Sequence, residues 1–266
     1  MIYFDKVCHH RFWEDCMAVS NDIIINQMTL RELLEENLKD SITQDVIEVP
    51  YLGRSGHSLG LHNWQRLAPC RNPFTRETID NLSSYIRKDE HITAILCIMS
   101  LPINDNQLWR AISSYVEKKQ YEITVLENKA LRGNPHVMFR SIQECLLKRL
   151  SLYPEKKMRD PSSSQIYSVS LFNKEKFRSY QRKLTKEINS IWPFPNKQLK
   201  RKKHQVLELI DILAEAGVPY SVLIPKIREH FPQVVARGEL SSRMHDLFND
   251  LESINTLDVV VGPGQF

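Results

Sequence analysis

Residues 42–76 read ITQDVIEVPYLGRSGHSLGLHNWQRLAPCRNPFTR, and this stretch differs in character from the rest of the chain. It contains three of the eight glycines in the sequence. Turn chemistry of this kind predicts loops around a short element. Leu61, Trp64 and Leu67 recur at a helical spacing that predicts about two turns of helix. The turn-forming residues are Gly53, Gly56, Gly60, Pro50, Pro69 and Pro73.

Helical patterns surround this stretch. Thr29 and Glu32 have the spacing of a capping box, and the leucines that follow them share one helical face. Further along, Asp105 can cap one helix and Pro135 can open another. Tyr121 to Leu126 could be a strand. Glycine, which weakens helix interiors, is scarce in the chain. We therefore predict an α+β, mostly helical protein, with a small loop-rich module and a helical C-terminal region.

The chain divides into four parts. Asp160 to Ser164, a Pro- and Ser-rich stretch, is the best linker candidate. A basic run from Lys197 to Lys203 comes before three predicted helices, and residues 259–261 could form a final strand. We find no internal repeat. The predicted helices of the last part are 204–216, 221–230 and 240–252. The four parts are an N-terminal helical extension (1–37), a small module (38–95), a helical region (96–160) and a C-terminal helical domain (166–266).

Composition places the chain among ordinary globular proteins. Hydrophobic residues make up 42% and charged residues 26% of 266 positions, and the net charge is +4. That charge does not demand nucleic acid as a partner. No apolar run approaches the roughly 20 residues of a membrane-spanning helix, and the N-terminus lacks the pattern of a signal peptide. The five cysteines are widely spaced, which favours reduced thiols and a cytoplasmic location.

Two motifs in the opening stretch resemble those of the U-box family. Ser55-Gly56-His57-Ser58 matches the family's Ser/Cys-Gly-His-Ser/Thr pattern, which follows an apolar contact residue, a turn and a Pro-containing strand. Asn72-Pro73-Phe74-Thr75-Arg76 resembles the family's Asp/Cys-Pro-apolar-Thr-Arg loop. The two motifs also fit together in order and in approximate spacing. The resemblance covers residues 38–95, about a fifth of the chain.

The resemblance implies a ubiquitin ligase that recruits a ubiquitin-conjugating enzyme charged with ubiquitin. Ile42 corresponds to the apolar contact of the first loop, and Pro73 corresponds to the contact of the second. Trp64 or Leu67 would line the groove between them. Arg76 matches the linchpin arginine, which bridges the conjugating enzyme and its ubiquitin through a planar, multi-donor head. Core packing of Ile42 and Trp64, and a solvated charge at Arg76, are the alternative interpretations.

A transferase of this RING/U-box type would form no covalent ubiquitin intermediate of its own. It would hold the thioester in a near-attack geometry for a lysine of an unknown protein substrate. The family includes effectors that intracellular bacteria inject into host cells. The resemblance therefore allows delivery into a host cell by a specialised secretion system, besides a cytoplasmic location.

We expect no metal and no cofactor in the module. A zinc RING needs about eight Cys or His ligands, and residues 38–95 offer only Cys70, His57, His62 and His91. The loops must then be held by hydrogen bonds and packing. His57 is expected to make a structural hydrogen bond across its loop. Near the N-terminus, Cys8-His9-His10 with Cys16 is an alternative zinc site, although its spacing is not that of standard ligand pairs.

Two other functions remain open at the level of sequence. The first is a nucleic-acid-binding regulator that uses residues 197–261, where a basic run, helices and a possible strand suggest a winged helix. The second is a helical scaffold without ligase activity.

Overall fold

The structure is a computed structural model that describes residues 28–68, 71–152, 171–189, 197–235 and 242–257. It is mostly helical with one small antiparallel sheet, which confirms the predicted fold class. The zinc candidate at residues 8–16, Cys70, the linker candidate and residues 259–261 lie outside the described residues. The helices are α2 (Leu30–Asn37), α3 (Leu61–Leu67), α4 (Leu82–Tyr85), α5 (Glu90–Met99), α6 (Asp105–Lys129), α7 (Val137–Leu152), α8 (Leu171–Asn189), α9 (Lys197–Glu215), α10 (Tyr220–His230), α11 (Pro232–Val235) and α12 (Ser242–Leu257).

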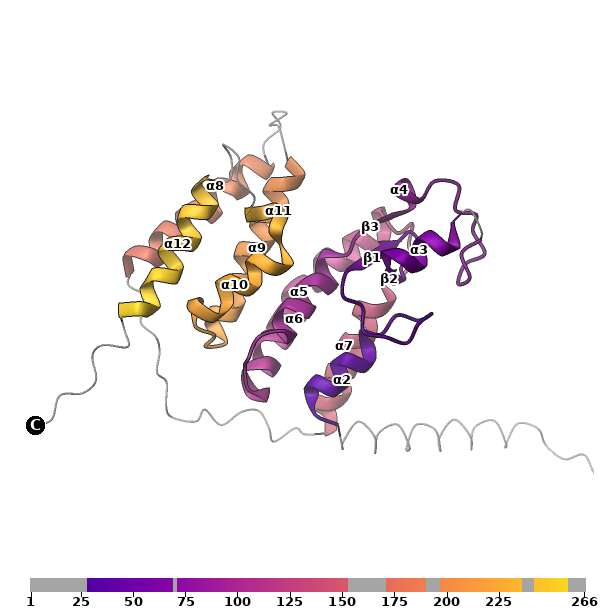
Figure 1. Cartoon of the computed structure of the whole chain (residues 1–266), viewed down its shortest axis with the longest axis horizontal. Helices are drawn as coiled ribbons and strands as arrows, with labels where there is room; N and C mark the ends of the chain where they lie inside the picture. The colour runs from indigo at the N-terminus through magenta and orange to yellow at the C-terminus, as the bar shows by residue number, and fades with distance from the viewer. Residues whose placement is uncertain (1–27, 69–70, 153–170, 190–196, 236–241, 258–266) are drawn as a thin grey trace, which may run out of the picture.

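The sheet contains three short strands in the order β2-β1-β3, where β1 is Pro50–Gly53, β2 is Ser58–Gly60 and β3 is Ile86–Lys88. Tyr51 of β1 lies opposite Leu59 on one side and Lys88 on the other, and both pairings are antiparallel. The turn chemistry at Arg54–Gly56 therefore closes a hairpin, and α3 follows directly after it. The sheet lies at one end of the molecule, together with α3 and α4 (Figure 1).

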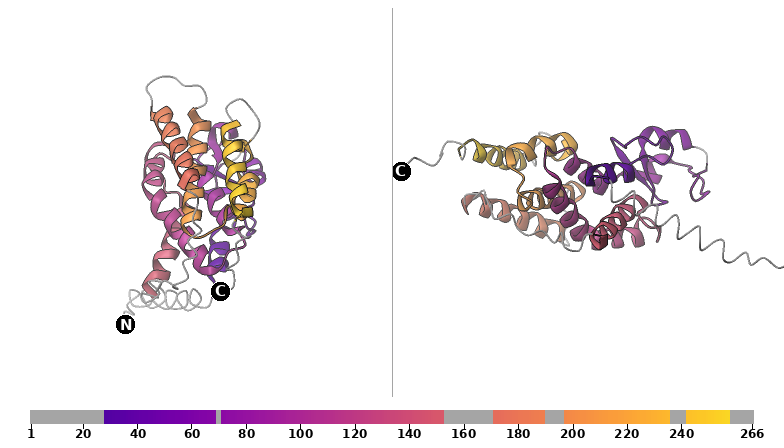
Figure 2. Two further views of the ribbon diagram at one scale, coloured as in Figure 1. Left: turned by 90° about the vertical axis from the view of Figure 1, so that its left-hand side faces the viewer. Right: turned by 90° about the horizontal axis from the view of Figure 1, so that it is seen from below.

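One apolar core runs through the rest of the molecule. It joins side chains of α2, α5, α6 and α7 to those of α8, α9, α10 and α12. Helices α5 and α6 lie between the sheet and the C-terminal helices in Figure 1, and Figure 2 shows the C-terminal helices at the end opposite the sheet. The boundary that we placed between residues 95 and 96 falls inside α5, whose residues Ile92, Ile95 and Ile98 are fully buried.

Local signals set several helix ends. The capping box at Thr29 and Glu32 is confirmed, because each side chain accepts a hydrogen bond from the other residue's backbone N–H. The cap of α6 is Asn104, one residue before the predicted Asp105, and it pairs with Gln107 in a second capping box. The predicted strand at Tyr121–Leu126 is wrong, because these residues continue α6.

The reason for that error is tertiary. Ile123, Thr124 and Val125 form a β-branched run that favours a strand in isolation. In the structure Tyr115, Val116, Lys119 and Ile123 are buried at helical spacing, so packing against the core overrides the local preference.

Across the helices that the structure describes, none is long and apolar enough to cross a membrane.

Candidate functional site

A small second core holds the sheet module together. It consists of Leu59, Trp64, Ile79 and Tyr85. The Trp64 side chain is fully buried, its indole Nε1 donates to the carbonyl oxygen of Tyr51 at 2.7 Å, and its ring meets that of Tyr85 edge-on. A Cβ at position 53 would collide with the Trp64 ring, which explains Gly53. Trp64 is therefore core, and the prediction that it lines a surface groove is wrong; Leu67, half-buried, remains the candidate.

The first loop is closed around the buried carboxylate of Asp40. A β-bridge between Lys39 and Val46 joins its ends. The Asp40 Oδ1 atom accepts from the backbone N–H of Ile42 at 2.9 Å, which makes an Asx-type turn. The Oδ2 atom accepts from Gly60 N at 2.8 Å and from Asn63 Nδ2 at 2.7 Å. A single side chain thus shapes the loop and ties it to β2 and α3.

The second loop is closed in the same way around Asn72, whose side chain is fully buried. A β-bridge between Arg71 and Thr78 joins its ends. The Asn72 Oδ1 atom accepts from Phe74 N at 2.8 Å and from Thr75 N at 3.2 Å. Its Nδ2 group ties the loop to the module by donating to Ser55 Oγ at 3.0 Å and to Tyr85 Oη at 2.8 Å.

The two loops are a short structural repeat. Asp40 to Ile47 reads DSITQDVI and Asn72 to Ile79 reads NPFTRETI. In both loops the first residue exchanges backbone hydrogen bonds of 2.8 Å with the fifth and sixth, and the fifth has a positive φ, 64° at Gln44 and 59° at Arg76. Only the Thr and the final Ile are identical, so the repeat is missed in a sequence search. Aligning the two acidic or amide turn residues would have revealed it.

The predicted contact residues lie on these loops and face solvent. The Ile42 side chain is 43% exposed, and Pro73 and Arg76 are also exposed. The guanidinium group of Arg76 makes no ion pair or hydrogen bond with any residue in the part of the chain that the structure describes. Large exposed apolar side chains lie on or near the two loops, and sequence reasoning missed all but Ile42. The others are Val46, Val49, Leu61 and Phe74.

A stacked pair of rings links the second loop to the hairpin. The rings of His57 and Phe74 are nearly parallel, with centroids 3.8 Å apart. The Nδ1 atom of His57 lies 3.4 Å from Ser55 Oγ, in keeping with the structural role expected for this histidine. Burial lowers the pKa of His57, although a hydrogen bond with the backbone of Ser55 opposes this shift, so the neutral ring is favoured at neutral pH. The stack holds the Phe74 ring of the second loop against His57 of the hairpin.

A buried charged network fastens the module to the helical body. Asp89 caps α5 by accepting from Ile92 N, and its other oxygen accepts from the Ser58 hydroxyl and lies 3.1 Å from His136 Nε2. Burial alone would raise the pKa of Asp89, but the charge and hydrogen bonds of His136 and Ser58 lower it. The three residue types suggest a catalytic triad, yet all are buried and the serine is bonded to Asp89 rather than to the histidine. The network therefore acts as a structural clamp that joins the module to the helical body, not as a catalytic site.

The β1–β2 turn is part of the same contact. The N–H of Val137 donates to the carbonyl of Gly56 at 2.9 Å, and Asn134 Nδ2 donates to the carbonyl of Arg54 at 3.1 Å. Gly56 has φ = 83°, and a Cβ there would collide with the carbonyl oxygen of Pro135. The residues before α7 therefore lie directly against the hairpin.

Two further parts of the structure bear on the other predicted sites. No group of three or more His, Cys, Asp or Glu side chains is placed to hold a metal ion among the residues that are described. The basic run at 197–203 lies in α9, where Lys200 and Lys203 are 8% and 3% exposed and Lys202 pairs with Glu90 at 2.6 Å. Burial, with a smaller effect of nearby Lys200, lowers the pKa of Lys203. Lys200 and Lys203 are therefore buried against the protein, and this weakens the case for a nucleic-acid surface at residues 197–203.

Comparisons with known proteins add no name to this geometry: no family model, no curated protein and no solved structure matches the chain.

Proposed function

We propose that residues 38–95 form a metal-free, U-box-like platform that recruits a ubiquitin-conjugating enzyme charged with ubiquitin. The observation that carries the proposal is the pair of matched loops. Each loop is fixed by one buried Asx side chain and presents an apolar residue to solvent, Ile42 on the first and Pro73 with Phe74 on the second. Rigid loops with exposed apolar side chains are what a protein partner needs for a small, specific interface.

Arg76 extends the proposal from docking to transfer. Its exposed guanidinium lacks an intramolecular partner among the described residues, and it follows the second-loop contact by three positions. A planar fork with several donors can bond carbonyls of two bound proteins at once. In this role Arg76 would favour the closed arrangement, in which ubiquitin packs against the conjugating enzyme and the thioester is open to attack by a substrate lysine.

Autoubiquitination with a panel of conjugating enzymes tests the proposal, and Ile42→Ala supplies the critical variant. Because Ile42 is exposed, the variant should keep its melting temperature while its activity and enzyme binding are lost, a cost of about 2 kcal/mol or more for a hot-spot side chain. Leu147→Ala is a matched control, since Leu147 is exposed on α7 and belongs to neither loop. Activity with no member of the panel, or equal activity of both variants, contradicts the proposal.

A further inference from the structure

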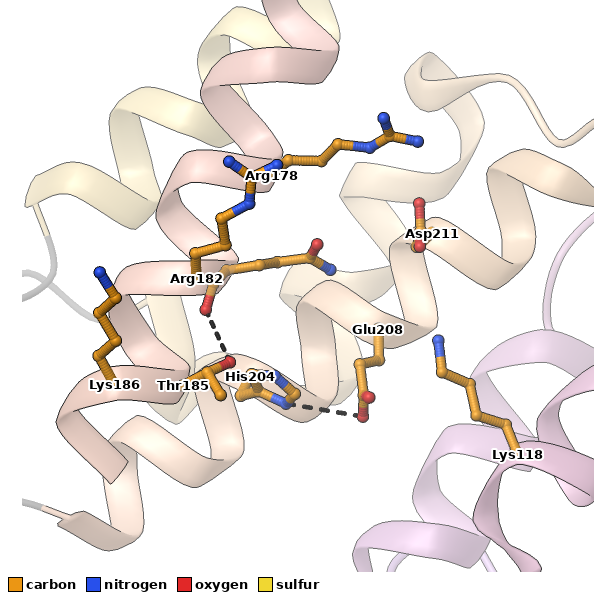
Figure 3. Close-up of a pocket in the computed structure, with 9 residues that line it drawn as sticks. Lys118, Arg178, Arg182, Thr185, Lys186, His204, Glu208 and Asp211 are labelled. Carbon is orange, nitrogen blue, oxygen red and sulfur yellow. Dashed lines mark hydrogen bonds and ion pairs between the residues drawn. The ribbon is translucent and has the colours of Figure 1, made fainter. Parts of the chain in front are cut away.

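A polar hollow of about 480 Å³ lies between α8, α9 and α6, in the helical body rather than in the module (Figure 3). Every side chain that lines it is polar or charged. Cavities of this size hold small molecules or cofactors, but most of them are lined by apolar side chains. A lining that consists only of polar and charged side chains indicates a ligand that is itself strongly polar.

Four cations lie around the hollow. Arg178, Arg182 and Lys186 occupy successive turns of α8 on one face, and Lys118 reaches in from α6. None of the four has an ion pair with any residue in the described ranges. Like charges one helical turn apart repel each other, so this row destabilises α8 unless an anion lies beside it.

The two acidic side chains of the hollow do not balance this charge. Glu208 of α9 is already paired with the buried ammonium group of Lys119, and it lies 3.7 Å from His204 Nδ1. Asp211 is the remaining carboxylate. Four cations against two acids leave an excess of two positive charges, before Lys119 is counted. The imidazole of His204 adds a further donor at the floor of the hollow (Figure 3).

We propose that this hollow binds a compact anion with several phosphate groups, an inositol polyphosphate that is either free or the headgroup of a phosphoinositide. Two arginines one turn apart can each hold a phosphate through a bidentate fork, and the lysines supply point charges around them. A peptide partner would need apolar side-chain pockets, which the lining does not offer. The site is independent of the two loops and of ubiquitin transfer.

Calorimetric titration of the full chain with inositol hexakisphosphate tests the proposal. The variant Arg178→Gln/Arg182→Gln should bind it at least about tenfold more weakly, because it loses two charge-assisted, bidentate contacts. The control Lys129→Gln/Lys183→Gln removes the same charge from exposed positions on α6 and α8 that do not line the hollow. It should bind as the unchanged protein does. Thermal unfolding of both variants checks that the fold is kept.

Vesicles distinguish the two sources of the phosphate groups. Phosphatidylcholine vesicles with phosphatidylinositol 4-phosphate are compared with vesicles that carry phosphatidylserine at equal net charge. Binding of the first kind alone, lost in the arginine variant, identifies a lipid headgroup; binding of hexakisphosphate without vesicle binding identifies a free ligand. The proposal is overturned if neither probe binds, if both variants lose affinity equally, or if an RNA or DNA oligonucleotide displaces hexakisphosphate and binds more tightly.

Discussion

Asn72→Ala is the sharpest test of how the second loop is held. The change removes four hydrogen bonds: two that the carboxamide oxygen accepts from the loop backbone and two that its amide donates to Ser55 and Tyr85. The side chain is 0% exposed, so its removal also leaves a small cavity. The cost of the lost hydrogen bonds should differ between the two ends of the side chain. Water can reach the loop backbone at the oxygen end more easily than it can reach Ser55 and Tyr85 at the amide end.

The magnitude follows from what remains after the change. A hydrogen bond contributes about 1 kcal/mol net, which gives an upper value of about 4 kcal/mol for four bonds. Water can replace the oxygen at the N–H groups of Phe74 and Thr75, because both residues are exposed and their bonds to Asn72 are only partly buried. Ser55 and Tyr85 are buried, although Tyr85 Oη keeps a contact with Glu77 at 3.3 Å. We therefore expect Asn72→Ala to lower the free energy of unfolding by about 2–3 kcal/mol.

Two companion variants make the test specific. Asn72→Asp should lose less than half as much, because the hydroxyls of Ser55 and Tyr85 can rotate and donate to a carboxylate, as Asp40 accepts donors in the first loop. Thr75→Ala changes an exposed side chain of the same loop and should cost no more than about 0.5 kcal/mol. Urea unfolding followed by circular dichroism measures all three. If Asn72→Ala costs no more than Thr75→Ala, the carboxamide is not what holds the loop.

Three other outcomes are expected. Arg76→Ala should slow ubiquitin discharge from the conjugating enzyme without changing binding of the uncharged enzyme, and Arg76→Lys should restore only part of the rate; equal losses in both assays would make it a plain docking contact. Burial lowers the pKa of His91 to about 3. As the pH drops below about 6.5, the unfolded chain therefore binds a proton that the folded protein does not bind, and the free energy of unfolding falls by about 2 kcal/mol at pH 5. His91→Gln should reduce this pH dependence in urea unfolding between pH 5 and 7, and an unchanged pH dependence excludes His91 as its cause. A metal chelator should leave the melting temperature unchanged, and stoichiometric zinc that is lost on substitution of His57 or Cys70 would contradict a metal-free module.

The sequence was most informative where the cause of structure is local. The Thr29 cap, the turn at Arg54–Gly56 and the helix at Leu61–Leu67 depend on residues within a few positions of each other. The same spacing could not tell core from surface. Successive positions three apart rotate by about 60° around a helix, so Leu61, Trp64 and Leu67 span a broad face. Only the packing against Gly53 and Tyr85 decides that Trp64 is its buried centre and Leu61 its exposed edge.

The attachment of the module to the helical body depends on residues that are far apart in sequence. No pattern in either segment predicts that it contacts the other. Asp89 and His136 meet across the fold, and the carbonyl of Gly56 accepts from Val137. Isolated, Asp89 would pass for an ordinary helix cap. In the structure Asp89 also lies beside a buried histidine from another segment. The same carboxylate therefore caps α5 and joins the module to the helical body. Since α5 belongs to the large core as well, the loops are positioned by the helical body and not by residues 38–95 alone. In the proposed function that span is the unit of recognition, while the unit of folding is larger.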